Sequence, residues 1–134
     1  MARTMLLNGL LVFLGGGLGS VARWWASTVA GERMGHGFPW GTLIVNMSGS
    51  LIIGLFATLT APDGRWVVSS QARLFFMAGV CGGYTTFSSF SLQTLELVQA
   101  GQLPRAGLNV LLSVALCLFG VWLGHVIAIA INPK

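Results

Sequence analysis

Four long stretches of the chain contain no charged side chain and are dominated by apolar residues. They cover residues 4–22, 34–62, 74–95 and 106–133. A membrane-spanning helix needs about 20 mainly apolar residues, and each stretch is about that long or longer. The pattern therefore predicts an all-α membrane protein with four transmembrane helices in a single integral membrane domain, residues 1–134. We expect these helices at about residues 5–28, 38–60, 73–98 and 105–131.

The composition excludes several classes of function. Apolar residues make up 54% of the chain and charged residues only 7%, against roughly 25% charged residues in soluble domains. The four stretches leave no room for a soluble catalytic domain, so we do not expect an enzyme. The basic residues are scattered singly, which argues against nucleic-acid binding. Cys81 and Cys117 lie in different stretches and are expected as small buried residues rather than a disulfide framework.

The positive charges are divided almost evenly between the two sides of the membrane. With four spans, one side carries Arg3, Arg65, Arg73 and Lys134, and the other carries Arg23, Arg33 and Arg105. An excess of positive residues on one side fixes orientation, and four against three is almost none. Either a single weak determinant sets the orientation, or the chain inserts both ways and pairs head to tail. Four short helices do not enclose a solvated pathway alone, so we expect an oligomer in either case.

The third span has an unusual centre. Residues 79–91 read Gly-Val-Cys-Gly-Gly-Tyr-Thr-Thr-Phe-Ser-Ser-Phe-Ser. A glycine pair followed by β-branched and hydroxyl residues is poor helix material. A broken helix at membrane depth is tolerated only where its backbone is buried in protein or lines a cavity. We therefore expect the third helix to be broken near its centre, at a transport site.

Neutral polar side chains, rather than acids, occupy the middle of the spans. Glu32 and Asp63 lie in predicted loops, and Glu96 lies at the end of the third span, so no carboxylate is expected at the membrane centre. The neutral candidates are Thr42, Asn46, Ser88, Ser89, Ser91, Asn109 and Ser113. Taken singly, a residue such as Asn46 can simply bond one helix to another. Taken together, amide and hydroxyl donors are able to replace the water around an anion.

Two phenylalanines and one arginine extend this interpretation. Phe87 and Phe90 are three residues apart and share a helical face; they either pack against their surroundings or offer an anion their positive ring edges. Arg23, at the end of the first span, either reaches the lipid headgroups or concentrates anions at an entrance. Neutral donors, ring edges and the absence of a central acid suit an anion better than a cation.

Three motifs resemble those of the Fluc (CrcB) fluoride channels. They are Gly-Ser-Val-Ala-Arg-Trp at residues 19–24, Gly-Thr-Leu-Ile-Val-Asn-Met-Ser-Gly at 41–49, and Gly-Gly-Tyr-Thr-Thr-Phe-Ser-Ser-Phe-Ser at 82–91. The resemblance covers essentially the whole chain. It implies passive, fluoride-selective export by a multi-pass protein of the cell (inner) membrane. It also implies an antiparallel, dual-topology homodimer with two pores.

The resemblance also implies roles for individual residues. Phe87 and Phe90 correspond to the pore phenylalanines, and Asn46 to the pore asparagine. The polar track corresponds to Thr42, Ser88, Ser89 and Ser91, with contributions from Asn109 and Ser113, and Arg23 lies at the entrance. The backbone carbonyls of Gly82 and Thr85 are implied to hold a structural sodium ion at the dimer centre. Gln93 departs from the family pattern, which often has glutamate there.

Two other classes of membrane protein remain as alternatives. A small multidrug-type transporter has a similar length, four helices and dual topology, but it needs a carboxylate in its first span, and residues 5–28 contain none. A non-transporting assembly subunit would use the glycines and phenylalanines for packing. It would not explain why hydroxyls, an asparagine and a helix break occur in one layer.

Overall fold

The computed structural model describes residues 1–132, which form helices joined by short connections. Three of the helices are long and apolar enough to cross a membrane: α1 (Ala2–Met34), α2 (Trp40–Leu59) and α6 (Leu103–Ile131). The fourth helical region is divided into α3 (Ser70–Arg73), the π-helix η1 (Leu74–Cys81), α4 (Gly82–Tyr84) and α5 (Phe87–Gln99). The described residues contain no strand, and the expected all-α class with four helical regions is confirmed. Lys134, counted above among the positive residues, lies outside the described residues.

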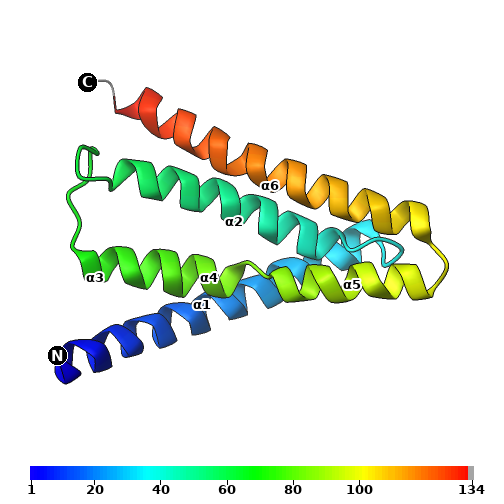
Figure 1. The fold of residues 1–134 in the computed structure, drawn as a ribbon, viewed down its shortest axis with the longest axis horizontal. Coiled ribbons are helices and arrows are strands. Elements are labelled where there is room, and N and C mark those ends of the chain that lie inside the picture. The colour runs from blue at the N-terminus through cyan, green and yellow to red at the C-terminus, as the bar shows by residue number, and fades with distance from the viewer. Residues whose placement is uncertain (133–134) are drawn as a thin grey trace.

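The four helical regions run back and forth between two ends of the molecule (Figure 1). Both termini and the connection from α2 to α3 lie at one end. The connections from α1 to α2 and from α5 to α6 lie at the other. α2 packs along α6, while α1 packs against η1 and α4. This arrangement places the start of α5 beside the middle of α2, where the candidate residues meet.

The first helix is longer than the sequence pattern suggests. The expected helix covered residues 5–28 and Glu32 was expected in a loop, but α1 continues through Glu32 and Arg33 to Met34. Charged residues at the end of a helix reach water and do not stop it. The helix stops at Gly35, whose φ of 86° is a backbone conformation that glycine adopts without strain.

Glycines set the distance between α1 and the helices that it crosses. A Cβ atom on Gly15 would lie 3.0 Å from the Cα atom of Gly79, and one on Gly19 would collide with the backbone carbonyl of Val80. The Gly120–Gly124 pair of α6 approaches the α2 backbone at Met47 and Leu51 in the same way. Small residues allow this close helix packing inside a membrane.

We expect alanine at position 19 to destabilise the protein and alanine at position 17 to be tolerated. The added methyl at Gly19 meets the Val80 backbone, whereas nothing lies within 4 Å of the Cβ position of Gly17. Overpacking typically costs about 1–3 kcal/mol, while glycine to alanine on an open helix face gains up to about 1 kcal/mol. Thermal unfolding of the two detergent-purified variants measures the difference. Equal melting temperatures would show that α1 does not pack this closely.

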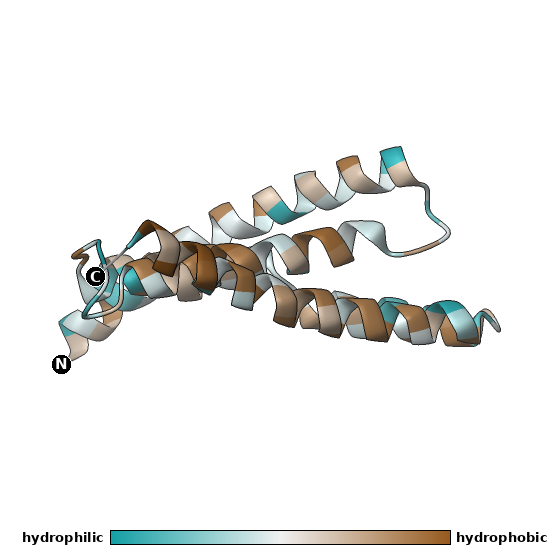
Figure 2. Cartoon of the chain, turned by 90° about the horizontal axis from the view of Figure 1, so that it is seen from above, coloured by the Kyte–Doolittle hydropathy of each residue, from teal (hydrophilic) through white to brown (hydrophobic). Residues whose placement is uncertain are grey.

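The outer surface of the helices is strongly apolar. Many large side chains of α1 and α6 are exposed, among them Phe13, Trp24, Leu111 and Leu118. Figure 2 shows hydrophobic colouring along much of each helix, with hydrophilic residues gathered mainly near the connections and ends. Patches of this extent need contact with lipid or with another protein surface. The surface therefore agrees with a membrane protein.

Candidate functional site

The chain between α4 and α5 is extended for two residues. α4 ends at Tyr84, Thr85 has φ −88° and ψ 159°, and Thr86 has φ −154° and ψ 113°. Thr86 then caps α5, because its Oγ1 accepts a hydrogen bond of 3.2 Å from the backbone N–H of Ser89. Threonine is a favourable N-cap. The hydroxyl run thus interrupts the third helical region and starts a new helix at Phe87 (Figure 1).

Asn46 of α2 holds this extended segment. Its Nδ2 donates to the Thr86 carbonyl at 2.9 Å, and its Oδ1 accepts from the Thr86 N–H at 2.7 Å. One side chain therefore bonds to both backbone groups of a buried residue in the extended segment. Asn46 does bond one helical region to another, as the packing interpretation expected. An asparagine amide has two N–H donors, so one of them remains for a ligand.

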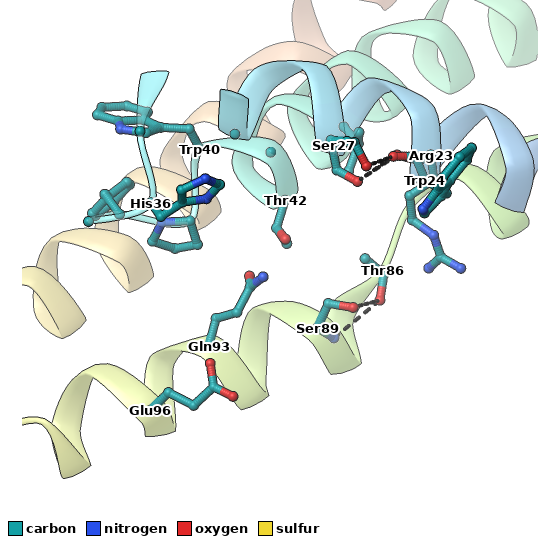
Figure 3. A pocket seen from close by; sticks show the side chains of 18 of the residues that line it. Arg23, Trp24, Ser27, His36, Trp40, Thr42, Thr86, Ser89, Gln93 and Glu96 are labelled. Atoms are coloured by element: carbon teal, nitrogen blue, oxygen red, sulfur yellow. Dashed lines mark hydrogen bonds between the residues drawn. The ribbon is translucent and has the colours of Figure 1, made fainter. Parts of the chain in front are cut away.

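A polar cavity of about 710 Å³ lies on one side of Thr86 (Figure 3). α1 contributes Arg23 and Ser27 to it, the α1–α2 connection His36, and α2 Thr42. From α5, the polar residues that line the cavity are Ser89, Gln93 and Glu96. These three residues are spaced i, i+4 and i+7, which is one face of a helix. Of the candidate residues, Arg23, Thr42 and Ser89 are gathered here.

A second, more apolar cavity of about 400 Å³ lies on the other side of Thr86. Six candidate residues line it: Asn46, Gly82, Thr85, Phe87, Phe90 and Ser113. The rings of Phe87 and Phe90 are tilted by 53° with their centroids 5.2 Å apart. Phe90 is 8% exposed and Phe87 is 77% exposed. Thr86 lines both cavities, so the Asn46–Thr86 pair stands between them.

Three candidate residues line neither cavity. Asn109 is 1% exposed and its Nδ2 donates to Thr94 Oγ1 at 2.9 Å, which links α6 to α5. Ser91 Oγ donates to the Phe87 carbonyl at 2.9 Å within α5. Ser88 Oγ lies 3.2 Å from Thr86 Oγ1 and is part of the cap of α5. Each of these side chains already has a hydrogen-bond partner within the chain.

Arg23 reaches the interruption rather than the outside of the bundle. Its Nη1 donates to the Thr85 carbonyl at 3.4 Å. The guanidinium therefore lies at the inner end of the polar cavity, close to where the two cavities meet. The role of Arg23 at an entrance stays a prediction.

Sequence reasoning missed the part that Thr86, Glu96 and His36 play in this site. Thr86 is one of several hydroxyl residues, and only its contact with Asn46 distinguishes it. The signal for Glu96 was its spacing from Ser89 and Gln93 on one helix face. His36 lies in a connection whose position depends on the fold, so no pattern in the sequence connects it with the cavity.

The apolar exterior and the helices long enough to cross a bilayer define an integral membrane protein with a polar cavity inside it. The chain belongs to the CrcB family: the family model described as "CrcB-like protein, Camphor Resistance (CrcB)" matches residues 10–125. The family that the three motifs indicated is thereby confirmed.

Close relatives carry the name of an ion channel. A protein of Rhodospirillum rubrum is 61% identical over 92% of this chain and 95% of its own length. A protein of Paramagnetospirillum magneticum is 58% identical over 95% of this chain and 99% of its own length. A protein of Methylocella silvestris is 55% identical over 94% of this chain and 96% of its own length. Each is named "Fluoride-specific ion channel FluC". These names describe channels and not enzymes, in agreement with the expectation that this protein is not an enzyme.

Proposed function

We propose that this protein is a fluoride-selective channel that exports fluoride passively across the cell (inner) membrane. The observation that carries the proposal is the pair of cavities meeting at Asn46 and Thr86, with hydroxyl and amide donors on one side and the Phe87–Phe90 rings on the other. The names of the relatives support it and favour it over a small multidrug-type transporter or an assembly subunit.

The chemistry of the polar cavity suits a small anion. Arg23 supplies positive charge at the inner end, and Thr42 and Ser89 supply hydroxyl donors along the way. Gln93 lines the same cavity from α5, and its amide Nε2 adds two more N–H donors. Together these groups replace the water that fluoride loses on leaving bulk solvent.

Beyond Asn46, the pathway becomes aromatic. The free N–H of Asn46 and the ring edges of Phe87 and Phe90 carry partial positive charge, and Ser113 adds a hydroxyl to the same cavity. Such weak, neutral contacts let an ion bind and leave again, which conduction requires. The route therefore runs past Thr42 and Ser89 to Arg23 and Asn46, and then between the phenylalanines.

We further propose that two chains form an antiparallel, dual-topology homodimer with two pores. The large exposed area of Phe87 supports this. A ring that lines a pore must be covered by protein on both sides, and a single chain covers only one side of Phe87. Gly82 is exposed near the same cavity. The nearly even division of positive charges supports insertion in both orientations.

The interruption before α5 also suits the proposed structural sodium ion. In a continuous helix, the Gly82 carbonyl would accept from the N–H of Thr86, but that N–H donates to Asn46 Oδ1 instead. The carbonyls at the end of α4 are thus left without helical donors, and oxygen atoms of this kind are the ligands that hard cations prefer. Gly82 and Thr85 would hold the ion through their carbonyl oxygens, and its charge would offset the partial negative charge of these oxygens. The Thr85 carbonyl also accepts a hydrogen bond from Arg23, so Arg23 and the ion would share this oxygen.

Fluoride efflux from proteoliposomes tests the function directly. Vesicles containing the purified protein are loaded with potassium fluoride or potassium chloride, and efflux is started by making the membrane permeable to potassium. We expect rapid fluoride release and retention of chloride. Release of both anions, or of neither, would contradict the proposal.

The sodium proposal predicts dependence on the cation. We expect fluoride efflux and dimer recovery to fall when sodium is replaced throughout by lithium or N-methylglucamine, because the carbonyls of Gly82 and Thr85 would lose their counter-charge. Efflux and cross-linked dimer are measured on the same preparation, and restoring sodium should restore both. Full transport after thorough removal of sodium would show that the interruption serves only to bend the chain.

A further inference from the structure

The polar cavity carries opposite charges at its two ends. At the inner end, the Arg23 guanidinium contacts the Thr85 carbonyl. Glu96 lines the same cavity from α5, seven residues beyond Ser89, which places it about 10 Å farther along the helix. Figure 3 shows Glu96 and His36 on opposite walls, away from Arg23 and Thr86. An anion coming from the outer end meets the carboxylate before it meets the guanidinium.

No described residue forms an ion pair with this carboxylate. The Glu96 side chain is exposed and has no hydrogen bond or ion pair with a described residue. Arg105 of α6 donates from Nη1 to the Gly37 carbonyl and to Gln102 Oε1 and forms no ion pair with Glu96. At physiological ionic strength the Debye length is about 8 Å, so screening weakens the field of Arg23 at the mouth.

We infer that Glu96 limits the rate at which fluoride reaches the inner part of the polar cavity. A cleft with low-dielectric walls concentrates the field of the charges that line it, and a negative charge at the mouth lowers the local concentration of anions. At fluoride concentrations that leave the pore mostly empty, flux is proportional to that local concentration. The inference rests on the proposed channel function and adds a rate-limiting residue to it.

Glu96→Gln tests the inference because it removes the charge and keeps the shape. We expect the initial rate of fluoride efflux at low fluoride and about 10 mM ionic strength to rise by roughly two- to fivefold, as one charge at this distance in a partly solvated cavity allows. In about 1 M potassium glutamate, where the Debye length is about 3 Å, the variant and the unmodified protein should have equal rates. All measurements use one pH.

Glu32→Gln is the matched control. It removes the same charge from the same end of the molecule, but Glu32 lies on the last turns of α1 and does not line the cavity. An unchanged or lower rate in Glu96→Gln, or an equal rise in both variants, would overturn the inference while leaving the channel function in place. Absence of fluoride efflux from the unmodified protein would instead overturn the proposed function, and the inference with it.

Discussion

Replacing Phe87 by leucine should reduce fluoride efflux at least tenfold while the protein keeps its fold and its dimer. Leucine keeps most of the apolar volume but has no positive ring edge, so fluoride loses a favourable contact in the second cavity. A tenfold change corresponds to about 1.4 kcal/mol in the barrier. Because Phe87 is 77% exposed in the single chain, its replacement removes little packing within the chain.

Phe13→Leu is the matched control for this experiment. Phe13 is 75% exposed and lies on α1, outside both cavities, so the same exchange should leave efflux unchanged. Phe90→Leu should also reduce efflux, but Phe90 is buried, and its replacement should lower stability as well, by about 1 kcal/mol. Near-normal efflux in Phe87→Leu, measured beside a normal dimer fraction, would show that the ring only fills space.

The course of the helices could be predicted from the sequence because it depends on local composition. Charge-free apolar stretches indicated the four helical regions, and Gly82-Gly83 with the following hydroxyl residues indicated an irregular segment in the third. The position of that segment could not be predicted to the residue. It depends on Asn46, which lies 40 residues earlier and pairs with Thr86 only in the folded chain.

The division of the candidate residues between two cavities could not be predicted from the sequence either. Ser88, Ser89 and Ser91 are equivalent as hydroxyl donors, but only Ser89 faces the polar cavity. The rotation of α5 about its axis decides this, and the Thr86 cap and the Asn109–Thr94 contact with α6 set that rotation. The i, i+4, i+7 spacing of Ser89, Gln93 and Glu96 was visible in the sequence. Without the neighbouring helices, however, it did not reveal what that face meets.

Asn46→Asp should nearly abolish fluoride efflux at neutral pH. The aspartate side chain has nearly the same shape, but an ionised carboxylate cannot donate to the Thr86 carbonyl as Asn46 Nδ2 does. It also places a negative charge where the two cavities meet. Two like charges 4 Å apart at an effective dielectric of 20 repel by about 4 kcal/mol, which corresponds to roughly a thousandfold lower occupancy by fluoride.

The pH dependence separates the effect of charge from the effect of the lost hydrogen bond. A protonated aspartic acid is neutral and has an O–H that donates to the Thr86 carbonyl, so efflux through Asn46→Asp should recover as the pH falls and the carboxyl group takes up its proton. Asn46→Ala loses both hydrogen bonds to Thr86 and has no group to titrate. Its efflux should therefore be low at every pH, apart from any change that the unmodified protein also shows. Efflux of each variant, divided by that of the unmodified protein at the same pH, gives the comparison. A normal rate in Asn46→Asp at neutral pH would remove Asn46 from the fluoride pathway and leave it as a support for the start of α5.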